Sequence, residues 1–115
     1  MKKLNESLYV DRKSKFYGYL YEIENIDEVN TILENLKKEN KKAKHFCYAY
    51  VFNNIQKKYE DKEPSGTSGT QILNILLYKG YKKHLIVVVR YFGGILLGSG
   101  KLLKAYKETA NALFK

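Results

Sequence analysis

Residues 90–100 read RYFGGILLGSG, and they join the apolar run Ile86–Val89 to a segment with helical spacing. Four glycines fall within eight residues of this stretch. Glycine serves where the backbone takes a positive φ or passes close to another group. A strand, a glycine-rich turn and a helix start also present free N–H groups and the positive end of a helix dipole, which suit an anion. Two interpretations follow, a tight turn that packs a helix on a sheet and an anion site, and the spacing alone favours the tight turn.

The stretch departs from two well-defined nucleotide-binding motifs. A P-loop ends in Gly-Lys-Ser/Thr, whereas Leu102 follows Gly100-Lys101 here. The dinucleotide fingerprint requires a third glycine where this chain has Leu103. The sequence therefore argues against a nucleotide pocket of either type.

The composition fits one domain with a basic surface. At 115 residues the chain can bury roughly 65% of its unfolded surface. The formal net charge of +9 favours RNA, DNA, a ribosome or an acidic protein as partner, or else it reflects a solvated lysine-rich surface. Cys47 is the only cysteine, which indicates a reducing, cytoplasmic setting without an internal disulfide. No apolar run reaches the ~20 residues of a membrane span, so we expect no membrane partner.

Periodicity and turn residues predict a regular succession of elements. A helix with a buried stripe, Leu102, Leu103, Tyr106, Ala110 and Leu113, is expected to follow an N-cap at Ser99. The sheet is expected to be mixed and mostly antiparallel, with helices on one face, which gives a two-layer α/β (α+β) sandwich. The other expected elements are strands at 8–10, 15–24, 45–52, 55–59 and 84–92, the last of them central, and helices at 27–40 and from 72 to the stop at Gly80.

Four motifs, in this order, resemble those of the YigZ/Impact family. They are KSKF at 13–16, AKHFCYAY at 43–50, DKEPSGTSG at 61–69 and VVRYFGGILLGSG at 88–100, the last followed by LKAY at 103–106. The resemblance implies a fold like the second domain of ribosomal protein S5, with residues 1–115 forming one Impact N-terminal-type domain. Bacterial members usually add a C-terminal ferredoxin-like domain, and this chain ends where that domain would begin. Three positions depart from the usual pattern: Lys62, Gln71 and Lys101.

The resemblance also bears on function. Eukaryotic relatives regulate translation by competing for a ribosome-associated activator of the amino-acid-starvation kinase. For bacterial relatives, nucleic-acid binding is the usual suggestion. We therefore expect a non-enzymatic domain, linked to translation, that binds RNA, the ribosome or another anionic partner.

Two groups of residues are the candidates for that function. In the first, basic side chains would neutralise phosphates while glycines let the backbone approach. In the second, the motif loop, Asp61 and Glu63 would orient the basic groups. The first group is Arg90, Tyr91, Gly93, Gly94, Gly98, Ser99, Gly100, Lys101 and Lys104, and the second is His45, Asp61, Glu63, Pro64, Ser65, Gly66 and Thr67.

Two other functions stay open. A small hydrolase would use Ser65 or Thr67, or a metal near His45 and Asp61, but a catalytic triad needs a base that an acid orients. Turn hydrogen bonds explain these hydroxyls more simply, and we expect no catalytic residue, metal or cofactor. A protein-binding adaptor would instead use the tyrosines that alternate at 17, 19 and 21. The oligomeric state is not readable from the sequence.

Overall fold

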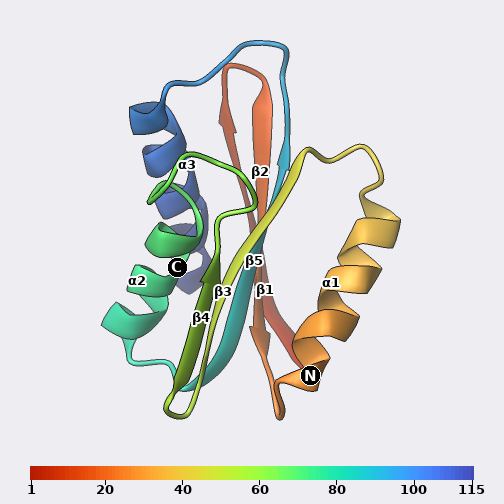
Figure 1. Cartoon of the computed structure of the whole chain (residues 1–115), viewed down its shortest axis with the longest axis vertical. Helices are drawn as coiled ribbons and strands as arrows, with labels where there is room; N and C mark the ends of the chain where they lie inside the picture. The colour runs from red at the N-terminus through yellow and green to blue at the C-terminus, as the bar shows by residue number, and fades with distance from the viewer.

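The computed structural model describes residues 1–115 and contains a five-stranded antiparallel sheet with three helices (Figure 1). The strand order is β1-β2-β5-β3-β4. None of the helices has the length and hydropathy that a membrane span requires. The elements are β1 (Lys2–Asp11), β2 (Ser14–Glu22), α1 (Asp27–Glu39), β3 (His45–Phe52), β4 (Ile55–Tyr59), α2 (Gly69–Lys79), β5 (Lys83–Tyr91), α3 (Ser99–Asn111) and a 3₁₀ turn at Ala112–Phe114.

Strand β5 lies at the centre of the sheet, as its two apolar faces predict. Residues 85–90 of this strand are all buried. Because side chains alternate along a strand, Ile86 and Val88 enter one core, while Leu85, Val87 and Val89 enter the other. The sheet therefore separates two hydrophobic cores.

The helices cover both faces of the sheet, which corrects the expected arrangement of two layers with helices on one face. Helices α2 and α3 pack on one face, and α1 packs alone on the other (Figure 1). The apolar side of α1, which includes Val29, Ile32 and Leu36, meets the core that contains Leu85 and Val87. An apolar strand face left in water is costly, so the second apolar face of β5 requires this third layer. The α/β class with an antiparallel sheet is confirmed.

The C-terminal ends of α1 and α2 agree with the sequence prediction to within a residue, whereas α2 begins at Gly69, three residues before the expected start at 72. Gly80 ends α2 in the left-handed conformation, with φ of 71°. Helix α3 begins at Ser99, but its N-cap is Gly98 and no side chain caps it, so the expected cap at Ser99 is wrong. Leu103 faces solvent and does not join the buried stripe of α3, because the turn of the helix carries position 103 away from Leu102 and Tyr106.

Gly93 and Gly94 shape the connection from β5 to α3. A Cβ at Gly93 would lie 2.2 Å from the carbonyl carbon of Lys13 and 2.4 Å from the nitrogen of Ser14. The Gly93 N–H donates to the Ser14 hydroxyl at 3.2 Å. Gly94 has a φ of 91°, a backbone conformation that residues with a side chain rarely adopt. This half of the glycine-rich stretch is thus a tight turn packed on the β1–β2 turn.

We expect Gly93→Ala to lower the free energy of unfolding by about 1–3 kcal/mol, because the new methyl group would overlap the backbone of the β1–β2 turn. Gly98→Ala is the matched control, since no atom lies within 4 Å of its Cβ position and its φ is negative. Urea unfolding of the three proteins measures the difference. Equal losses for both variants would contradict the packing role of Gly93.

Candidate functional site

The sequence motifs meet at one end of the molecule. Antiparallel pairing places Lys15 opposite Tyr91 and His45 opposite Arg90, so the start of β2, the end of β5 and the start of β3 lie together. The end of β4 pairs near the start of β3 as well. The β1–β2, α1–β3, β4–α2 and β5–α3 connections therefore cluster at this end (Figure 1).

A buried ion pair lies beneath these loops. One Arg90 guanidinium nitrogen, Nη1, donates to both Glu63 carboxylate oxygens, at 2.9 and 2.8 Å. The hydroxyl of Tyr106 on α3 also donates to Glu63. Arg90 is 5% exposed and Glu63 is 8% exposed, and the guanidinium lies 5.5 Å above the Phe16 ring. Arg90 is thus occupied inside the protein, and the expectation that it supplies surface charge to an anion is wrong.

His45 and Asp61 connect strand β3 to the motif loop. The His45 Nδ1 atom lies 2.7 Å from the Asp61 carbonyl oxygen, and its Nε2 atom lies 3.5 Å from Glu63 Oε1. The Asp61 carboxylate accepts the Phe46 N–H at 2.6 Å. Both imidazole nitrogens therefore face oxygens of the loop rather than a serine or threonine hydroxyl.

Cys47 and Tyr106 extend this polar cluster into the core. The Cys47 thiol lies 3.4 Å from the Tyr106 hydroxyl and donates to the Glu60 carbonyl at 3.3 Å. Burial raises the pKa of Cys47 to about 12 and raises the pKa of Tyr106 strongly, so both groups stay protonated near neutral pH. A thiol held in this form is a poor nucleophile.

The Ser-Gly-Thr part of the motif loop is held by turn hydrogen bonds. The Thr67 hydroxyl donates to the Pro64 carbonyl at 2.6 Å, and Gly66 has a φ of 82°. Ser65 and Pro64 face solvent. No group of three or more His, Cys, Asp or Glu side chains is placed to hold a metal ion. The arrangement supplies neither a base beside Ser65 nor a set of metal ligands, so it does not favour the hydrolase hypothesis.

Glu60 organises this loop, and the sequence reasoning missed it. Its carboxylate accepts hydrogen bonds from the N–H groups of Gly66 and Ser68 and from the hydroxyls of Ser68 and Thr70, at 2.6–3.1 Å. Partial burial alone would raise the pKa of Glu60, but these hydrogen bonds outweigh it and lower the pKa to about 2. The sequence signal that could have identified Glu60 is an acidic residue shortly before the hydroxyl-rich start of a helix.

The start of α3 is open to solvent. Gly98, Ser99, Gly100 and Lys101 are exposed, and no side chain caps their N–H groups. A Cβ added at Gly98 or at Gly100 would meet no atom within 4 Å. Lys104, one helical turn after Lys101, is exposed too. The fold leaves this part of the predicted anion site free.

Tyr91 lies on the opposite face of the sheet from α3. Its hydroxyl donates to the Asn40 side-chain oxygen at 2.5 Å, and its ring meets Tyr17 edge to face. The candidate residues thus fall into several places: a buried cluster around Glu63, the exposed Pro64 and Ser65 of the motif loop, the tight turn at Gly93 and Gly94, the exposed start of α3, and an aromatic surface around Tyr91.

Removing the carboxylate charge at position 63 is expected to destabilise the fold. Glu63→Gln keeps the side-chain shape but leaves the buried Arg90 without a counter-ion, a change that costs about 3–5 kcal/mol. Chemical denaturation measures the loss. Glu34→Gln, on the exposed side of α1, is the control and should change the stability by less than about 0.5 kcal/mol. A Glu63→Gln protein as stable as this control would contradict the role of the pair.

Glu60 makes the stability depend on acid pH. Its pKa is lower in the folded protein than the ordinary 4.5, so its contribution is complete above pH 4.5 and is lost as the pH falls toward about 2. We expect the stability difference between wild type and Glu60→Gln to be largest near neutral pH and to shrink over that window. Thermal unfolding between pH 2 and pH 7 measures it. A difference that does not vary with pH would contradict this assignment.

Comparison with known proteins places these motifs in one family. The family model of the Impact N-terminal domain matches residues 12–114. The IMPACT family member YvyE of Bacillus subtilis is 38% identical over 114 residues, which cover 96% of this chain and 52% of YvyE. The chain therefore spans about half the length of this relative.

Two solved structures resemble the whole chain. A crystal structure of a hypothetical protein matches with a TM-score of 0.91 and 30% identity, over 99% of this chain and 61% of that one. The two-domain translational regulator Yih1 matches with a TM-score of 0.57 and 20% identity, over 97% of this chain and 46% of that one, and this likeness concerns the fold alone. Because the family model matches nearly all of its residues, the chain belongs to the Impact N-terminal domain family.

Proposed function

We propose that this domain takes part in regulating translation by binding RNA, free or within the ribosome, through its basic end. The observation that carries the proposal is the concentration of exposed basic side chains on the clustered connections and the adjacent starts of β2 and α3. Two acids of the adjacent loop are occupied within the protein, because Glu63 pairs with Arg90 and Glu60 accepts four hydrogen bonds. The exposed basic residues are Arg12, Lys13, Lys15, Lys41, Lys42, Lys44, Lys62, Lys101 and Lys104.

The start of α3 supplies the specific contacts in this proposal. Its uncapped N–H groups and the helix dipole favour a phosphate, and the missing side chains at Gly98 and Gly100 leave space for one. Lys101 and Lys104 add charge on the same side of the helix. Such contacts position a nucleic acid by its backbone and carry no base preference.

The link to translation is supported by the family. Yih1, which shares the fold, is described as a translational regulator. A domain that acts on translation works in the cytoplasm, a setting with which the free thiol of Cys47 is compatible.

Charge reversal at the start of α3 tests the proposal. Binding of a labelled RNA of about 12 nucleotides is measured across a salt series, within the range that small single-strand sites cover. For Lys101→Glu/Lys104→Glu we expect affinity at low salt to fall tenfold or more. The slope of log K against log salt should flatten by about 1.4 if two phosphate contacts are lost.

The control is Lys82→Glu/Lys83→Glu, which makes the same charge change at the opposite end of the sheet, where both side chains are exposed. The control should bind more weakly only through the general fall in net charge and should keep the wild-type slope. If both double variants lose affinity equally, the start of α3 is not a phosphate site.

A further inference from the structure

Helix α1 leaves part of its sheet face uncovered. On the edge strand β1, Leu8 and Val10 are each 53% exposed. They pair directly with Tyr17 and Lys15 of β2, so all four side chains lie on the face that α1 shares. Apolar and aromatic side chains thus remain accessible beside α1 rather than beneath it.

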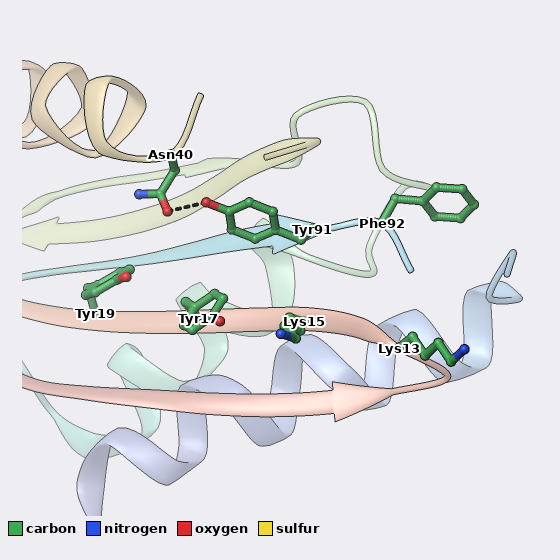
Figure 2. A pocket seen from close by; sticks show the side chains of 7 residues that line it. All are labelled: Lys13, Lys15, Tyr17, Tyr19, Asn40, Tyr91 and Phe92. Atoms are coloured by element: carbon green, nitrogen blue, oxygen red, sulfur yellow. Dashed lines mark hydrogen bonds between the residues drawn. The ribbon is translucent and has the colours of Figure 1, made fainter. Parts of the chain in front are cut away.

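This open face is hollowed into a groove of about 400 Å³ (Figure 2). Four aromatic rings, two lysines and one amide line it, and no carboxylate does. A second hollow continues along β2, sharing Tyr17 and Tyr19 and adding Glu6, Ser7 and Leu8. The first hollow, which we call the tyrosine groove, is lined by Lys13, Lys15, Tyr17, Tyr19, Asn40, Tyr91 and Phe92.

Two rings of the tyrosine groove, Tyr91 and Tyr17, are held by neighbouring side chains. The Tyr91 hydroxyl donates to Asn40 Oδ1, and Asn40 Nδ2 donates to the Leu36 carbonyl at 2.8 Å, which fixes the ring from α1 (Figure 2). Tyr17 meets Tyr91 at a centroid distance of 5.8 Å and an angle of 81°. Rings held in this way lose little freedom when a ligand binds.

Ammonium groups accompany the rings at both ends of the groove. Lys44 Nζ lies 5.6 Å from the centre of the Phe92 ring, and Lys3 Nζ, which also pairs with Glu6 at 2.9 Å, lies 5.8 Å from that of Tyr19. Lys15 lies two residues before Tyr17 on β2, and Lys13 lies in the β1–β2 turn just before that strand (Figure 2). A ligand that matches this groove has flat rings that stack on the tyrosines and negative charges beside those rings. Single-stranded nucleic acid has both along its whole length.

We infer that the tyrosine groove binds single-stranded nucleic acid, with bases stacked on Tyr17, Tyr19 and Tyr91 and phosphates at Lys13 and Lys15. The inference rests on the proposed function for its class of partner but names a different surface, on the other side of the sheet from α3. Lys13 and Lys15 belong both to the groove and to the basic end, so one strand of RNA can contact both surfaces. A duplex is a poor ligand for the groove because its bases are already stacked.

The test measures binding of the same short RNA, single-stranded or annealed to its complement, to wild type and variants of the whole chain. Tyr17→Leu/Tyr19→Leu removes two stacking rings and keeps apolar side chains in the strand. We expect its affinity for the single strand to fall by about tenfold or more, since each stacked base contributes roughly 5- to 150-fold. Tyr78→Leu, a tyrosine 87% exposed on α2, is the matched control and should bind like wild type.

Three further measurements guard against a folding effect. Thermal unfolding shows whether the tyrosine variant is folded. Lys13→Gln/Lys15→Gln alters only exposed side chains and should weaken single-strand binding at least fivefold with a flatter salt dependence. In wild type, RNA should shift the NMR signals of the Asn40 side-chain amide, which lines the groove.

The outcomes separate this inference from the proposed function. If the Lys101/Lys104 reversal weakens binding and the groove variants bind like wild type, the tyrosine groove is not the site, while the basic end stands. If Tyr17→Leu/Tyr19→Leu loses affinity and the α3 reversal matches its control, the groove is supported and the α3 contact fails. If wild type binds no RNA at low salt, both fail. A wild-type dimer that Tyr17→Leu/Tyr19→Leu dissociates, without RNA affinity, would instead make the groove an interface between copies.

Discussion

The ion pair between Glu63 and Arg90 joins the parts of this domain that lie far apart in sequence. Glu63 comes from the motif loop and Arg90 from the central strand, and Tyr106 brings α3 to the same carboxylate. Burying two charges costs several kcal/mol for each ion, which close geometry and further hydrogen bonds must offset. The contact of Arg90 Nη1 with both carboxylate oxygens and the tyrosine donor meet that requirement for Glu63. The positions of the loop and of α3 at the end of the sheet follow from this cluster.

The same interaction separates the residues that hold the fold from those that are free to bind. Glu63 accepts hydrogen bonds from Arg90 Nη1 and from Tyr106, and Glu60 accepts N–H groups of the loop, while the buried Nε of Arg90 has no hydrogen-bond partner. Because Glu60 and Glu63 accept hydrogen bonds from groups inside the protein, they do not pair with the lysines on the neighbouring connections. The positive field at this end is therefore a consequence of how the interior is paired, as well as of the net charge.

Most strands and hairpins were predictable because their signals are local, although β1 runs over Lys2–Asp11 where only residues 8–10 were expected. The expected strand 45–52 and the turn at 53–54 match β3 and the start of β4, since alternating aromatic residues and two asparagines carry the information within a few positions. The number of layers was not predictable in this way. The apolar faces of β5 and of α1 were both visible in the sequence, but which helix meets which face depends on how the chain crosses the sheet.

The sequence predicted which motifs form the site, but it did not predict the role of each residue in it. Arg90 shares the strand parity of Ile86 and Val88, so its direction into the core was available from alternation once β5 was known to be central. Its partner Glu63 lies 27 positions away, and no local pattern pairs the two. Tyr91 has the opposite parity and therefore faces Tyr17 and Asn40.

A glycine-rich stretch that looks like one site thus serves the two faces of a sheet. Gly93 rests on the backbone of the β1–β2 turn, which holds that turn against the β5–α3 connection. The β1–β2 turn also contains Lys13, which lines the tyrosine groove. The tight-turn and ligand interpretations of the stretch are therefore not exclusive. Residues 93–94 make the close packing, and residues 98–101, which no neighbour constrains, keep the helix start accessible at the same end of the protein.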